Sequence, residues 1–207
     1  TARYGHGVAA AWGLGGGMLA SECPEIMPWP ERRKAEVDAR LGPRVAQLVD
    51  GHWDASIFPN CSYLVGTRVF KVWHPIAPDR VEIMTWAIAD KAMPDDMKRR
   101  LNVAVHRTFG AAGVLEADDL ANLETISRSS KGRAARKGGM NLQMGLGREY
   151  EDADFPGVLG NFISETAQRG FYRFYRDCLE SGSWGELAAA PANWREDILG
   201  QEPGSSE

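Results

Sequence analysis

The chain has 207 residues, 43% hydrophobic and 25% charged, a balance ordinary for a globular domain with one substantial core. Its net charge of −4 at pH 7 argues against nucleic acid as the main partner. The three unevenly spaced cysteines predict no disulfide framework, and the sequence has neither a signal-peptide pattern nor an apolar run of membrane-spanning length. We therefore expect a cytoplasmic protein without a membrane segment.

The first part of the chain predicts a strand, a helix and a β-meander. A strand within residues 1–12 ends in a glycine run at 13–17, and a proline-broken linker follows through Pro30. A helix is expected over residues 31–48, disturbed at Gly42-Pro43. Four candidate strands come next, near residues 51–58, 61–65, 68–74 and 80–88.

An amphipathic helix is expected over residues 95–109. Pro94-Asp95 supplies a start signal, and Gly110-Ala-Ala-Gly113 interrupts the helix. The residues spaced for one apolar face are Met97, Leu101, Val105 and Phe109.

A second helix, expected to end near residue 128, carries an acid on its apolar stripe. The stripe consists of Leu115, Asp119, Leu123 and Ile126. An unpaired carboxylate among apolar residues is costly, and a metal ion at Asp119 is one way to compensate it. A carboxylate near a helix start is more often a cap or a dipole partner, a role open to Glu116 and Asp118.

The remaining chain predicts helices and loops. The basic segment Arg128–Lys137 could dock an acidic partner surface, although a solvated, mobile loop is the simpler interpretation. A long helix is expected near 161–180 and a short one near 184–190, while the tail 201–207 should be disordered. We find no repeat and no domain boundary, so residues 1–207 are interpreted as one α+β domain.

His52 and Asp54 alternate with Trp53 on a predicted strand, so both side chains should project to the same face. On a buried face they would need partners or would line a wet cavity. A hydrogen-bonded structural pair is the alternative.

Short motifs run in a characteristic order across almost the whole chain. They are Tyr4-Gly5, Phe58-Pro-Asn60, Phe70–Ile76, Met93–Leu101, Arg107–Gly113, Glu116–Asp119, Phe155–Gly160, Arg169–Tyr175 and Ser183-Trp184. Together they are specific, and the chain resembles the C-terminal catalytic part of the large (alpha) subunit of Rieske-type aromatic-ring-hydroxylating dioxygenases, near the naphthalene and polycyclic-arene branch. The resemblance implies an incomplete helix-grip fold, in which an antiparallel sheet wraps around a long helix.

The resemblance implies that Asp119 is the carboxylate ligand of a mononuclear Fe(II), which the family binds through two histidines and one carboxylate. It further implies a Rieske 2Fe-2S cluster, electrons from NADH through a reductase and ferredoxin, and a small (beta) subunit in an oligomer. The implied reaction adds both atoms of O2 to an apolar polycyclic arene, which yields a cis-dihydrodiol.

The chain departs from the family pattern at the other metal ligands. None of its histidines (His6, His52, His74 and His106) forms a His-x4-His pair, and none of its cysteines (Cys23, Cys61 and Cys178) has a histidine two or three positions later. We therefore interpret the chain as a fragment that lacks the Rieske domain and the two iron-ligand histidines, and expect it to be inactive alone.

The resemblance also assigns a substrate pocket. Its lining matches Ala11, Met18, His52, Asp54, Leu64, Thr67, Phe109 and Leu115. Most of these residues are apolar, as a hydrocarbon site requires, although the Asp54 carboxylate departs from that character. The alternative function is a non-enzymatic hydrophobic-ligand-binding protein of the helix-grip fold, which would have no reason to place Asp119 beneath its cavity.

Overall fold

The structure is a computed structural model that describes residues 1–11, 22–49, 51–153, 155 and 157–189. Its strands are β1 (Gly7–Ala11), β2 (His52–Ile57), β3 (Cys61–Leu64), β4 (Val69–Ala77), β5 (Arg80–Ala87), β6 (Tyr150–Glu151) and β7 (Val158–Leu159). Its α-helices are α2 (Pro28–Val49), α3 (Asp95–Phe109), α4 (Val114–Ser130), α5 (Thr166–Glu180) and α6 (Trp184–Ala189), with 3-10 helices at Pro24–Ile26, Val65–Thr67 and Ala135–Lys137.

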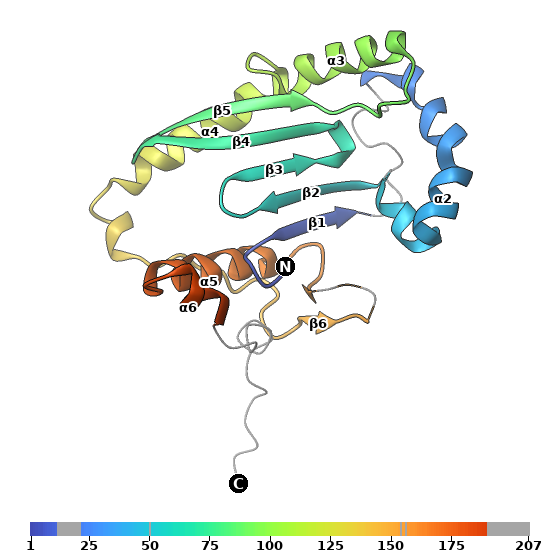
Figure 1. The fold of residues 1–207 in the computed structure, drawn as a ribbon. Helices are drawn as coiled ribbons and strands as arrows, with labels where there is room; N and C mark the ends of the chain where they lie inside the picture. The colour runs from blue at the N-terminus through green and yellow to red at the C-terminus, as the bar shows by residue number, and fades with distance from the viewer. Residues whose placement is uncertain (12–21, 50, 154, 156, 190–207) are drawn as a thin grey trace. The chain divides into compact units, whose positions relative to one another are not determined.

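Strands β1 to β5 form one sheet in sequence order, and β6 pairs with β7 (Figure 1). The pairs β3–β4 and β4–β5 are antiparallel, so the predicted α+β class with an antiparallel sheet is confirmed. No helix in the described part of the chain is long and apolar enough to cross a membrane.

The chain divides into two compact units. One contains Thr1–Ala9, Ala55–Pro59 and the residues from Met140 onward, and the larger one contains Ala10–Asp54 and Asn60–Gly139. Strands β1 and β2 run through both units. The interpretation of residues 1–207 as one domain stays a prediction.

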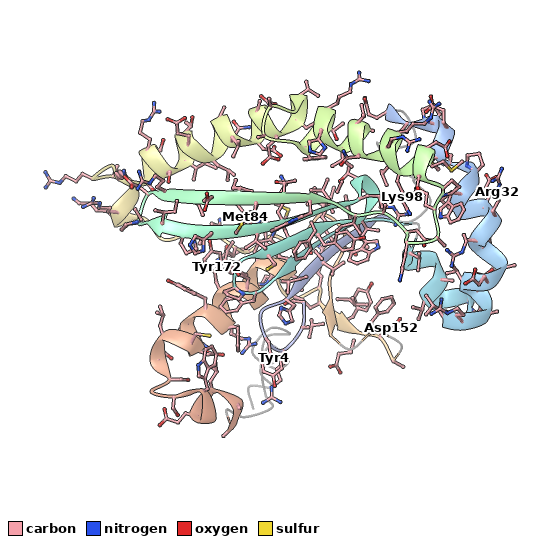
Figure 2. The ribbon with its side chains drawn as sticks, turned by 45° about the horizontal axis from the view of Figure 1, so that its top comes forward. Tyr4, Arg32, Met84, Lys98, Asp152 and Tyr172 are labelled. Atoms are coloured by element: carbon pink, nitrogen blue, oxygen red, sulfur yellow. The ribbon has the colours of Figure 1, made fainter. Side chains whose placement is uncertain are left out.

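The sheet of the larger unit has two different faces. Val69 and Lys71 of β4 lie opposite Ala87 and Thr85 of β5, and β5 residues of this face line a cavity with α3 and α4. On the other face, tilted aromatic rings lie next to one another from strand to strand: the centroids of Tyr63 and Phe70 are 6.3 Å apart, and those of Phe70 and Trp86 are 6.1 Å apart. Figure 2 labels Met84, which belongs to this second face, on β5.

Helix α3 provides the core of the larger unit. Three residues of its predicted stripe, Leu101, Val105 and Phe109, are buried, and Met97 packs against them from a partly buried position. Cys23, Ile26, Val69, Met93 and Ala104 complete the cluster. The predicted apolar face of this helix is confirmed, and Figure 1 shows α3 and then α4 running along β5.

The smaller unit is held together by α5. Phe174 is buried on this helix, and its ring lies 4.9 Å from Phe58 and 5.7 Å from Tyr4, both edge-on. Arg169 pairs with the fully buried carboxylate of Glu149. Tyr172, labelled in Figure 2, lies on the same helix but is 41% exposed. The aromatic run 171–175 is therefore partly core and partly surface.

Several predicted boundaries were wrong for local reasons. Helix α2 starts at Pro28 because proline is compatible with a first helical turn, and its predicted break is confirmed at Gly42, which has a φ of 76°. Helix α5 starts at Thr166, five residues later than expected; the Ser164 hydroxyl donates to the Asn161 carbonyl at 2.7 Å and closes a turn there. The basic segment is a loop only in part, since α4 continues to Ser130 and a 3-10 helix covers Ala135–Lys137.

Candidate functional site

The junction between α3 and α4 is a tight turn made possible by two glycines. A Cβ at Gly110 would lie 2.6 Å from the carbonyl oxygen of His106, and a Cβ at Gly113 would lie 2.3 Å from that of Thr108. Any larger residue would force the backbone apart. The turn places the start of α4 against the sheet, and the acidic residues 116, 118 and 119 follow within about two helical turns.

A buried ion pair lies beneath this junction. The Lys71 ammonium of β4 donates to the Glu116 carboxylate of α4, and each residue is only 3% exposed. Lys71 Nζ also lies 5.2 Å from the Phe109 ring centroid and 5.6 Å from that of Trp73. Removing one partner from a buried pair leaves an uncompensated charge and typically costs about 3–5 kcal/mol.

Asp119 lies three residues after Glu116 on α4, and its side chain is exposed. The expected apolar surroundings are not found, since Leu123 is 45% and Ile126 is 63% exposed. The acid that is buried on this helix is Glu116. The stripe is apolar in sequence, but only its first residue, Leu115, packs against the core. The metal role of Asp119 stays a prediction.

The donor chemistry at Asp119 fits one ligand of an iron ion. A carboxylate is the oxygen ligand of the family's expected site, and no hydrogen bond or ion pair within the described residues engages this one. No group of three or more His, Cys, Asp or Glu side chains in the described part of the chain could hold a metal. Asp119 can therefore supply one oxygen donor.

Three predicted pocket residues come together in the larger unit. Phe109 belongs to the core cluster, and Leu64 and Leu115 pack against it from partly buried positions. Thr67 is buried, and its hydroxyl donates to the Leu64 carbonyl at 3.3 Å. Of the others, Met18 lies outside the described residues, and for Ala11 the structure gives only its place in β1. The pocket role of all eight stays a prediction.

His52 and Asp54 lie on β2, as predicted, in different environments. His52 is half-buried against Gly66, where a Cβ would come within 2.1 Å of His52 Nδ1, and that nitrogen is buried with no hydrogen-bond partner among the described residues. Desolvation raises the pKa of the Asp54 carboxyl above its ordinary value, and the charge of His52 opposes the shift. They do not form the hydrogen-bonded pair considered as an alternative.

A cavity of 450 Å³ lies between β5 and the two helices. Most of its lining is apolar, and the polar contributors are Thr85, His106 and Glu116. The full lining is Val81, Ile83, Thr85, Ala87, Val105, His106, Gly110, Ala111, Glu116 and Leu120. Its lining contains none of the six predicted pocket residues whose side chains the structure describes.

Sequence reasoning missed the Lys71–Glu116 pair. Lys71 alternates with Val69 and Trp73, which was a signal that the lysine faces the core and needs a partner. Its partner lies 45 residues later in sequence, and nothing in the pattern identifies it. Glu116 was considered only as a helix-start acid.

The fold and this junction define the class of the protein: an α+β domain whose antiparallel sheet packs against a glycine-separated helix pair. Residues 9–181 match the family described as the ring hydroxylating alpha subunit (catalytic domain). The chain therefore belongs to this family.

Its relatives are large subunits of aromatic dioxygenases. The chain is 39% identical, over 96% of its length, to the large oxygenase component of the naphthalene 1,2-dioxygenase system of Pseudomonas aeruginosa, and covers 45% of that protein. It is 34% identical, over 89% of its length, to the biphenyl 2,3-dioxygenase subunit alpha of Rhodococcus jostii, and covers 41% of it.

A solved structure of a naphthalene 1,2-dioxygenase mutant bound to phenanthrene superposes on the chain with a TM-score of 0.89 at 37% identity. The match covers 97% of this chain and 46% of that one. The chain thus spans less than half the length of the relatives that it matches.

Proposed function

We propose that the full-length protein is the large subunit of a ring-hydroxylating dioxygenase. It adds both atoms of O2 to adjacent carbons of an apolar polycyclic arene, and NADH supplies the two electrons, so that arene, O2, NADH and a proton give a cis-dihydrodiol and NAD⁺. The observation that carries the proposal is the family match over residues 9–181. The structural similarity to naphthalene 1,2-dioxygenase supports it.

In this proposal Asp119 is the carboxylate ligand of a mononuclear iron, whose chemistry when bound is the activation of dioxygen. Two histidine ligands and the Rieske 2Fe-2S cluster come from parts of the full-length protein other than the described residues. The small subunit, a ferredoxin and a reductase complete the system, and the full-length subunit is an oligomer.

The residues of this chain would bind the arene through an apolar surface and orient it through a few polar groups. Leu64, Phe109 and Leu115 form one contiguous apolar group, which suits the flat hydrocarbon surface of an arene. Thr67, His52 and Asp54 add polar atoms, and Ala11 and Met18 complete the proposed lining. The half-buried His52, whose Nδ1 has no hydrogen-bond partner in the described part of the chain, is suited to orient a substrate or a bound water.

The test is product formation by the full-length subunit, co-expressed with its small subunit and supplied with ferredoxin, reductase and NADH. Naphthalene and phenanthrene should each give a cis-dihydrodiol, with both oxygen atoms labelled under ¹⁸O2. Tight arene binding without any oxygenated product would instead support a hydrophobic-ligand carrier and contradict the proposal.

A further inference from the structure

Helix α4 is attached to the sheet mainly by its first turn. The helix begins after Gly113, and no side-chain cap holds its start. Glu116 is its buried residue, while the stripe beyond it is exposed at Leu123 and Ile126. The first turn of α4 is held in two ways: Leu115 packs against the core, and the Glu116 carboxylate accepts a hydrogen bond from Lys71 of the sheet.

The partner of Glu116 is itself fixed from several sides. Lys71 lies on β4, an inner strand that pairs on both sides, in register with Ser62 of β3 and Thr85 of β5. Its ammonium lies over the ring of Phe109, the last residue of α3. Lys71 therefore contacts the residues on either side of the 110–113 turn, one at the end of α3 and one at the start of α4.

Asp119 follows Glu116 by three residues, a spacing of about 4.5 Å along a helix axis, and the two are neighbours on the helix surface. A displacement of the first turn of α4 would therefore displace the backbone of Asp119 as well. We infer that Lys71 and Glu116 are positioning residues, whose buried ion pair fixes the place and direction of the Asp119 carboxylate. This inference rests on the proposed ligand role of Asp119.

The test measures the iron dissociation constant of the full-length subunit, at a temperature where circular dichroism shows every variant to be folded. Lys71→Met and Glu116→Gln should each weaken iron binding by about tenfold to a hundredfold, the range found when groups that orient a metal ligand are removed. The matched control is Glu124→Gln, which removes an exposed carboxylate of α4 that pairs with Arg128 at 2.5 Å, and iron affinity should not change.

The two substitutions separate positioning from a charge effect. Glu116→Gln removes a negative charge near the proposed cation, so it would weaken binding by either route. Lys71→Met removes a positive charge, so a charge effect alone would strengthen binding, whereas lost positioning weakens it. Stronger binding by Lys71→Met, or wild-type binding by both folded variants, overturns the inference.

Asp119→Asn is measured in parallel. Loss of iron from this variant, with iron retained by the Lys71 and Glu116 variants, rejects the positioning role alone. Full iron in Asp119→Asn rejects the ligand assignment, and the inference fails with it. If a single substitution prevents folding, Lys71→Met combined with Glu116→Met removes both buried charges, and the same loss of affinity is expected.

Discussion

Replacing Leu101 with alanine should strongly destabilise the larger unit. Leu101 is 1% exposed and packs in the α3 cluster with Val69, Val105 and Phe109. Loss of its side chain removes buried apolar surface and leaves a cavity, which costs about 3–5 kcal/mol at such positions. For a chain of this size each 1 kcal/mol lowers the melting temperature by roughly 2–4 °C, so a decrease of roughly 6–20 °C is expected.

The matched control is Val103→Ala on the same helix. Val103 is 57% exposed, so little packing is lost, and alanine is the better helix former by up to about 0.7 kcal/mol. Urea unfolding followed by circular dichroism compares the two variants. Equal losses of stability, or a loss below about 1 kcal/mol for Leu101→Ala, would show that α3 does not pack through the predicted face.

Three further outcomes follow from the structure. Because the pKa of Asp54 is raised, its carboxyl contributes to stability below its ordinary pKa, and this contribution is lost as pH rises through the raised pKa. Asp54→Asn should therefore raise the melting temperature near pH 7 and change it little in strong acid. A larger rise of the melting temperature in strong acid than near pH 7 would be inconsistent with the desolvation of Asp54. A hydrogen bond from Lys131 and the charge of Lys131 lower the pKa of Asp79. The contribution of this pair to folding stability is therefore present above the ordinary aspartate pKa and is lost as pH falls through the lowered pKa. Lys131→Met should return the pKa of Asp79, measured by NMR titration, toward its ordinary value. In the full-length enzyme, Leu115→Trp should reduce turnover of three- and four-ring arenes at least about tenfold more than that of naphthalene, and an equal loss on both would remove Leu115 from the pocket.

The sequence predicted the elements whose periodicity is strong. The stripe of α3, the break at Gly42 and the meander of β2 to β5 were predicted from local residue patterns, and the structure agrees. The two-residue strands β6 and β7 were missed because such short segments carry no detectable alternation. The family was predicted from ordered motifs and is confirmed by the match over residues 9–181.

The site could be predicted only in part. Periodicity placed Asp119 on an apolar stripe, but exposure depends on what covers the helix, and beyond Leu115 the stripe is exposed. The residue that is buried, Glu116, owes its position to Lys71 on a distant strand. Pairings of this kind depend on the tertiary fold, which the local pattern does not contain.

The proposed role of Asp119 as the carboxylate ligand of the iron is tested by iron analysis of the purified full-length subunit. Asp119→Ala is compared with Asp118→Asn, which changes the adjacent exposed carboxylate of the same helix. We expect the Asp119→Ala subunit to lose its iron and all dihydroxylation, whereas the Asp118→Asn subunit keeps most of both. Full iron occupancy in the Asp119→Ala subunit would contradict it.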